Sequence, residues 1–270
     1  MNLKWQWLPI ILGGSWLGYH WLGQRAVPPE PLTHHRQDVT YSQTPTLLIP
    51  GWAGNAWTFN GFLRWLPRAG YAQKVLTVRV SWTGKLRFSG QWDGTGENPV
   101  IQVLFDHSAT RGYQQQVQWL TAILRALKQR YGVSSYNVVA HSWGGSAAVH
   151  TLVRHGHHAD LPVLHRLVLL GAPVDEGSLD TPDVSYQRLR AAKHHLMAHP
   201  KARIINVYGT LSGHLTDGSV PVSQITPLRG VVSGSPVGYV EVHVPATSHR
   251  QLHATERMWR LIATHLWVNA

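Results

Sequence analysis

The sequence predicts an α/β domain in which helices cover both faces of a mostly parallel sheet. Three observations support this prediction. Short apolar runs alternate with helical patterns from Thr46 onward, as in parallel sheets that are covered on both faces. The apolar run that ends at Ala140 leads directly into a helical segment of small residues. With 270 residues, of which 43% are hydrophobic, the chain can bury a sizeable core as one large domain or two small ones.

The expected elements follow from the period of the apolar residues. Strands are predicted at 47–49, 75–80, 100–105, 137–140, 167–170, 204–208 and 239–244. Helices are predicted at about 57–66, 111–131, 143–155, 187–199 and 250–267. The glycine-rich residues 84–98 are expected to form an antiparallel edge hairpin or a loop.

The first 23 residues differ from the rest of the chain. Lys4 precedes a mostly apolar run over residues 5–22, which is typical of a secretory signal peptide or a signal anchor. The alternative is an amphipathic helix packed on the domain. We therefore expect residues 1–23 to direct the protein to the cell surface or the extracellular space. Residues 24–45, polar and rich in proline, are expected to form a linker to the folded domain at 46–270.

Residues 173–201 are longer than an ordinary crossover between two strands. The segment begins with acidic residues and continues as a basic amphipathic helix. An insertion that leaves the carboxyl end of a strand can cover a site as a cap. A cap over the site and an ordinary surface helix are equally good expectations here.

Ser142 is the strongest functional signal. It lies between the strand that ends at Ala140 and a helix that opens with Gly144 and Gly145. Such a strand–turn–helix corner is the nucleophile turn of α/β-hydrolases, which lifts a serine hydroxyl above the sheet. Its usual pattern is Gly-x-Ser-x-Gly, and Ala140 replaces the first glycine.

A serine nucleophile needs a histidine base and an acid that orients the base, in the chain order serine, acid, histidine. Asp217 is the candidate acid because it lies in a turn-rich loop after a strand, whereas Glu241 and Glu256 lie inside expected elements. Asp175 is the alternative.

His249 is the candidate base because it lies in the loop between the last strand and the last helix. His253, four residues later, is the alternative. The oxyanion hole should consist of two backbone N–H groups, one from the residue after the nucleophile, Trp143, and one from the loop after an early strand, most simply Trp52.

Four segments together resemble a known family: 48–55 (LIPGWAGN), 139–145 (VAHSWGG), 216–221 (TDGSVP) and 248–253 (SHRQLH). In this order they are similar to the exported α/β-hydrolases of lactic acid bacteria and relatives, the DUF915 family, which resemble small lipases. The resemblance spans about residues 44–268. It implies carboxylesterase activity on short to medium acyl esters, with Ser142, Asp217 and His249 as the triad. Trp143 where methionine is common and Pro50 where histidine is frequent are departures that bear on the substrate.

Composition limits the remaining possibilities. The chain has no cysteine, which excludes disulfides and thiolate chemistry. Its eighteen histidines include the groups 155–158 and 194–199, but there is no His-Glu-x-x-His motif, and we expect neither a metal nor a cofactor. The net charge of +11 makes an anionic cell wall or membrane surface a candidate partner, and the alternative is a solvated basic surface without such a partner. Without a nucleic-acid-binding motif, no nucleic acid is expected.

Three functions are compatible with these residues. The first is a serine carboxylesterase that cleaves small ester substrates. The second is a non-catalytic cell-surface binding protein with the same fold. The third is an acyltransferase or lipase that uses the same triad. An intact triad in the expected chain order favours an enzyme, because a binding protein has no need of one.

Overall fold

The computed structural model describes residues 23–177 and 181–269. Within these ranges eight strands form one sheet in the order β3-β2-β4-β1-β5-β6-β7-β8. The strands are β1 (Thr46–Ile49), β2 (Gln73–Val80), β3 (Leu86–Gly90), β4 (Pro99–Phe105), β5 (Ser135–His141), β6 (Val163–Leu170), β7 (Arg203–Thr210) and β8 (Gly238–Pro245). All neighbouring pairs are parallel except β2 with β3.

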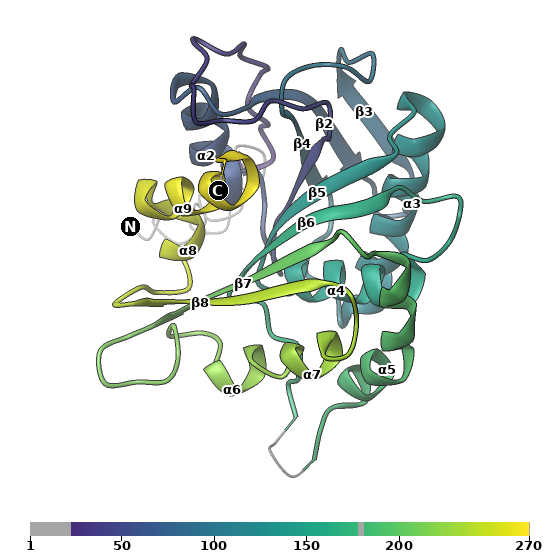
Figure 1. The fold of residues 1–270 in the computed structure, drawn as a ribbon, viewed down its shortest axis with the longest axis vertical. Helices are drawn as coiled ribbons and strands as arrows, with labels where there is room; N and C mark the ends of the chain where they lie inside the picture. The colour runs from purple at the N-terminus through teal and green to yellow at the C-terminus, as the bar shows by residue number, and fades with distance from the viewer. Residues whose placement is uncertain (1–22, 178–180, 270) are drawn as a thin grey trace, which may run out of the picture.

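Helices cover both faces of this sheet (Figure 1). The described helices are α2 (Trp57–Arg68), α3 (Tyr113–Tyr131), α4 (Trp143–His155), α5 (Val184–Ala192), the 3₁₀ helix η1 (Lys193–Ala198), α6 (Val222–Ile225), α7 (Leu228–Val232), α8 (Gln251–Ala254) and α9 (Glu256–Trp267). The predicted α/β fold with helices on both faces is confirmed.

Two apolar cores result, one on each face. Side chains of α3, α4, α5 and η1 form the first core with the sheet, and those of α2 and α9 form the second. Burial on both faces explains why the strands read as apolar runs rather than alternating ones. All seven residues of β4 are buried.

The predicted strands are all present, and residues 84–98 contribute the antiparallel edge strand β3. The prediction of one continuous helix over 250–267 is wrong, because Thr255 adopts an extended conformation that separates α8 from α9. The predicted helix 187–199 begins earlier, at Val184, where the Asp183 carboxylate caps it by accepting from the Ser185 N–H. The short helices α6 and α7 were not predicted, since four or five residues show no helical period.

The segment expected to be a linker lies against the domain. Val27 and Val39 are buried in the second core. Thr40 N–H donates to the Trp267 carbonyl, and Val39 pairs with Val268. The expected signal sequence or anchor at 1–23 falls almost wholly outside the described residues. Over the parts of the chain that the structure describes, no helix is both long and apolar enough to cross a membrane.

Residues 173–201, for which a cap over the site was one expectation, have two parts. The helical part packs against one face of the sheet, where Leu189 of α5 and Leu196 of η1 are buried in the first core. The first residues, by contrast, follow β6 at the carboxyl edge of the sheet, and Pro173 and Glu176 line a pocket there. The described helix therefore covers the sheet, and of the described residues in this segment only Pro173 and Glu176 line the pocket.

Candidate active site

The loops that carry the candidate residues leave the same edge of the sheet. Strands β1, β5, β6, β7 and β8 run parallel, so their carboxyl ends lie together. Ser142 follows β5, Asp217 lies in the loop after β7, and His249 lies in the loop after β8. This edge is where α/β proteins bind their ligands.

Ser142 has the strained backbone of a nucleophile turn. Its φ is 53° and its ψ is −133°, a region that non-glycine residues rarely adopt and that marks functional sites. The turn is held in place because Ser142 N–H donates to the Leu170 carbonyl of β6 at 2.9 Å. The hydroxyl is thereby presented at the start of α4, and the side chain is partly exposed.

Small residues allow the close packing around this turn. A Cβ on Gly144 would lie 2.3 Å from the Pro50 carbonyl oxygen, and one on Gly51 would lie 2.9 Å from the Ser142 Cβ. Both positions therefore need glycine. Ala140, which replaces the first glycine of the usual pattern, is fully buried in the first core, so its methyl group finds space there.

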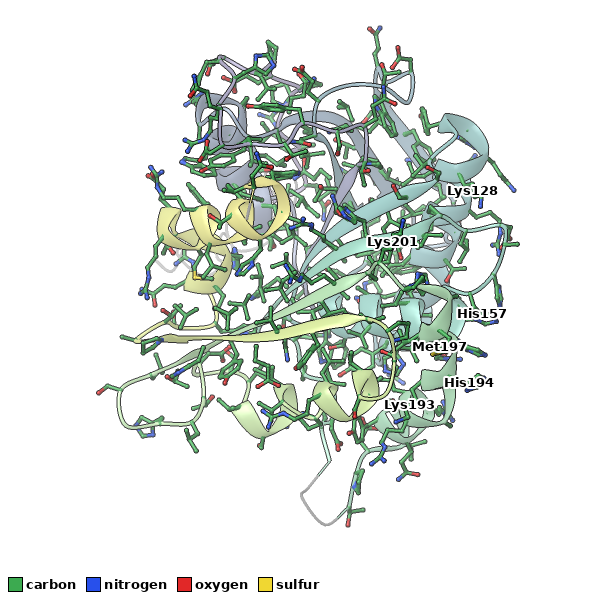
Figure 2. All side chains as sticks on the ribbon, in the orientation of Figure 1. Lys128, His157, Lys193, His194, Met197 and Lys201 are labelled. Atoms are coloured by element: carbon green, nitrogen blue, oxygen red, sulfur yellow. The ribbon has the colours of Figure 1, made fainter. Side chains whose placement is uncertain are left out.

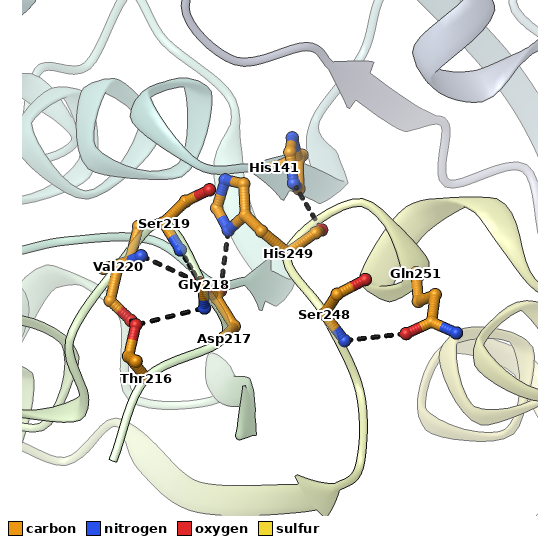
Figure 3. A network of polar contacts seen from close by, with 9 residues as sticks. All are labelled: His141, Thr216, Asp217, Gly218, Ser219, Val220, Ser248, His249 and Gln251. Atoms are coloured by element: carbon orange, nitrogen blue, oxygen red, sulfur yellow. Dashed lines mark hydrogen bonds and ion pairs between the residues drawn. The ribbon is translucent and has the colours of Figure 1, made fainter. Parts of the chain in front are cut away.

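Asp217 and His249 form a hydrogen-bonded pair. The His249 Nδ1 lies 2.6 Å from the Asp217 Oδ2, and the Asp217 side chain is fully buried. The other carboxylate oxygen accepts from the backbone N–H groups of Ser219, at 2.9 Å, and Val220, at 2.8 Å. Figure 3 shows the 216–220 loop curled around this carboxylate, with the His249 ring directed toward it. The contact between His249 and Asp217 favours the histidine tautomer with the proton on Nδ1.

Gly171 borders the pair from the β6 side. Its φ is +58°, and a Cβ there would lie 2.9 Å from the Asp217 Oδ2 and 3.0 Å from the His249 Nδ1. Any larger residue would press on the hydrogen bond itself. Gly171 leaves no distinctive signal in the sequence, because a glycine after a strand is a common turn residue.

Ser142 and His249 line the same pocket. Its volume is about 430 Å³ and its walls are Trp52, Ser142, Trp143, Pro173, Glu176, Ser219, Val220, Gln224 and His249. Among the described residues, no hydrogen bond joins the Ser142 hydroxyl to His249. Such bonds are often long before substrate binds, and they tighten in the reacting complex.

The two candidate oxyanion donors border this pocket. Gly51 to Gly54 form a turn, closed by Gly54 N–H donating to the Gly51 carbonyl at 3.0 Å, with Ala53 at a φ of 51°. Trp143 is the first residue of α4, and the first N–H groups of a helix have no partner within it. In the described chain, neither Trp52 N–H nor Trp143 N–H donates to another residue.

The alternative residues have other partners. Asp175 accepts from the backbone N–H groups of Gly177 and Asp183 and so organises the loop after β6. Glu241 pairs with Arg229, and Glu256 pairs with Arg260. The structure thus brings Asp217, and not these acids, against His249.

His253 lies behind the pocket. Its Nδ1 donates to the Thr58 carbonyl at 2.8 Å, and its ring meets the ring of His141, with 4.5 Å between centroids. His141 in turn bonds through Nε2 to the His249 carbonyl at 3.1 Å. In the sequence His141 gives no sign of this contact, because it is simply the last residue of a strand.

Both supporting histidines are held neutral. Burial lowers the pKa of His253 to about 4. Burial, together with the neighbouring His253 and His249, holds the pKa of His141 well below its usual range. These rings therefore act as neutral packing and hydrogen-bonding groups under His249.

Acidification should destabilise the fold through His253. Its pKa is about 4 in the folded protein and 6.5 ordinarily, so between these values the unfolded chain binds a proton that the folded chain does not. Stability from this residue is thus complete above pH 6.5 and is lost as the pH falls toward 4, by up to about 3 kcal/mol. Urea unfolding of the wild type and His253→Gln at pH 7 and pH 4.5 measures this. The variant should lose less stability than the wild type between pH 7 and pH 4.5. An equal loss in both proteins would contradict the lowered pKa of His253 in the folded state.

Histidines of the two groups noted in the sequence meet on the surface, whereas His199 is buried. The rings of His157 and His195 stack with 3.7 Å between centroids, and His194 lies 4.1 Å from His195. Figure 2 labels His157 and His194 on this side of the molecule. Throughout the described ranges, however, no three His, Asp or Glu side chains are arranged to hold a metal ion.

Known structures share this fold. A gene product of Listeria innocua superposes with a TM-score of 0.73 at 23% identity, over 83% of this chain and 94% of that one. A Lactobacillus plantarum protein assigned as a cell surface hydrolase gives 0.66 at 18% identity, over 83% and 89%. The mature Bacillus licheniformis lipase BlEst2 gives 0.52 at 13% identity, over 88% and 95%. No curated protein matches the chain in sequence.

The sequence itself matches one family model over residues 33–269. That family is described as "Alpha/beta hydrolase of unknown function (DUF915)". The match covers most of the chain and includes Ser142, Asp217 and His249. The resemblance seen in the four sequence segments is therefore confirmed, and the protein belongs to the DUF915 family of α/β-hydrolases.

Proposed function

We propose that this protein is a serine carboxylesterase that cleaves esters with short to medium acyl groups. One observation carries the proposal. His249 is hydrogen-bonded at 2.6 Å to the buried Asp217, and it faces the same pocket as a serine in a strained nucleophile turn. This combination activates a serine hydroxyl. The hydrolase family and the lipase-like fold support the same reaction class.

In the proposed reaction the Ser142 Oγ attacks the ester carbonyl while the His249 Nε2 takes its proton. Asp217 holds the proton on Nδ1 and stabilises the imidazolium that forms. The N–H groups of Trp52 and Trp143 bind the oxyanion, and each is expected to contribute about 3–4 kcal/mol to the transition state. His249 then protonates the leaving alkoxide, and water, activated by the same histidine, releases the acid.

The size of the pocket supports small substrates. A volume of about 430 Å³ lies in the lower part of the range for small-molecule sites, roughly 300–1,000 Å³. Long acyl chains would extend past its rim into solvent. We therefore expect the rate to peak at short or medium acyl length.

A chain-length series of p-nitrophenyl esters tests the proposal. We expect hydrolysis of the acetate, butyrate and octanoate esters, with lower kcat/KM for the palmitate. Covalent labelling of the protein by a fluorophosphonate should accompany hydrolysis, because an activated serine reacts with such reagents. Absence of both hydrolysis and labelling would favour the non-catalytic binding protein. An acyltransferase would instead be recognised by preferred transfer to an added alcohol over water.

A further inference from the structure

The candidate active-site pocket carries a single free negative charge at its rim. Glu176 lines the pocket and is exposed. Its Oε1 accepts a hydrogen bond of 2.9 Å from the Trp143 indole N–H. The lining includes no lysine or arginine, although the chain as a whole has 24 of these and only 13 acidic residues.

Glu176 is also unusual among the acidic residues of the described chain. Eight of the twelve described acids form ion pairs: Glu30, Asp38, Glu97, Asp106, Asp160, Asp217, Glu241 and Glu256. Asp93, Asp175 and Asp183 accept hydrogen bonds within their own loops. Of the described acids, Glu176 thus remains the one that faces the pocket without a cationic partner.

Two indole side chains line the pocket together with this carboxylate. Trp52 and Trp143 line the same pocket, and the Trp52 side chain is 56% exposed. Its indole N–H is bound to the Thr110 carbonyl, at 3.2 Å, while Trp143 is held by Glu176 on one side and by the edge-on ring of Tyr113, at 5.0 Å, on another. Both rings are therefore held in place by contacts with the rest of the protein and do not need a substrate to position them. Aromatic faces together with a carboxylate are the recognition chemistry of ammonium groups.

We propose that this pocket selects esters that carry a positive charge close to the scissile bond. The substrate ammonium would lie between Glu176 and the faces of Trp52 and Trp143 while Ser142 attacks the carbonyl. The inference rests on the proposed esterase function and names its substrate class. The cation can belong to the acyl part, as in an aminoacyl ester, or to the alcohol part, as in a choline ester.

Two isosteric substrate pairs test the proposal. Alanine methyl ester is compared with methyl isobutyrate, in which a methyl group replaces the ammonium group. Acetylcholine is compared with 3,3-dimethylbutyl acetate, in which carbon replaces the quaternary nitrogen. The alanine ester is assayed at or below about pH 7, where its amine is largely protonated. The readout is the ratio of kcat/KM for the charged ester to that for the neutral one.

The matched variant is Glu176→Gln, whose amide oxygen can still accept from the Trp143 indole but carries no charge. We expect the wild-type ratio to exceed one in at least one pair, and the variant to lower it by about twofold to fivefold, the effect of one exposed charge pair. Glu176→Lys should lower it further. Because each ratio is taken within one variant, a general change of folding or chemical rate cancels.

Each outcome decides a different point. If the charged ester is preferred over the neutral one in the alanine pair, the cation is bound on the acyl side. If the charged ester is preferred in the choline pair, the cation is bound on the alcohol side. Hydrolysis of the neutral esters with a ratio near one, or a ratio that Glu176→Gln leaves unchanged, overturns the cation site but leaves the esterase intact. No hydrolysis of any ester and no fluorophosphonate labelling overturn both.

Discussion

Replacing Ser142 with alanine is expected to lower kcat for p-nitrophenyl butyrate by about 10⁴-fold or more. The hydroxyl is the nucleophile in the proposed reaction, and no acyl-enzyme can form without it. The partly exposed Ser142 stands at the pocket with a φ of 53°, and alanine can adopt this strained backbone no less readily than serine. Folding should therefore persist while catalysis is lost.

Initial rates, fluorophosphonate labelling and thermal unfolding of the same preparations measure this effect. Ser223→Ala is a suitable control, because Ser223 is exposed and is absent from the walls of the candidate pocket. It should hydrolyse the ester at the wild-type rate and accept the label. A Ser142→Ala protein that folds and keeps its activity would refute the assignment of the nucleophile.

Asp217→Asn should lower kcat by about 10⁴-fold, because it reverses the hydrogen bond that orients the base. The backbone N–H groups of Ser219 and Val220 both point at one carboxylate oxygen. They would hold the asparagine oxygen at that position and turn its NH₂ group toward the His249 Nδ1. His249 would then have to accept at Nδ1, and its proton would move to Nε2, where it cannot act as a base.

Asp175→Asn provides the matched control. Asp175 is also buried and also accepts two backbone N–H groups, but it does not contact His249. Its replacement should change stability, while kcat stays close to the wild-type value because Asp175 lies outside the reacting network. If the two variants lost activity equally, the pairing of Asp217 with His249 would not be the source of the effect. Steady-state kinetics on both proteins, with unfolding curves, make the comparison.

Much of the fold could be predicted because its signals are local. Burial on both faces makes each parallel strand a short apolar run, and all seven expected runs became strands. The predictions failed where the chain departs from a regular period. Thr255 breaks the last helix through its own extended backbone, and residues 24–45 look like a linker although Val27 and Val39 are buried.

The candidate site was predicted less completely. Ser142 stood out because its strand, turn and helix are contiguous in the sequence. Glu176 did not, because only the path of the loop after β6 brings it to the pocket. His141 did not either, since its partner, the His249 carbonyl, is 108 residues away. Such contacts depend on the register of distant strands and leave no local pattern.

The sequence by itself determined the fold class and the position of the strained serine, since apolar periodicity and small residues around a turn act over a few neighbours. The tertiary structure decided which acid and which histidine meet. Asp217 and His249 lie 32 residues apart, and their loops converge because β7 and β8 pair in parallel. It also placed Asp175 and His253 with other partners, because the direction of a side chain is set by the packing of the whole sheet edge.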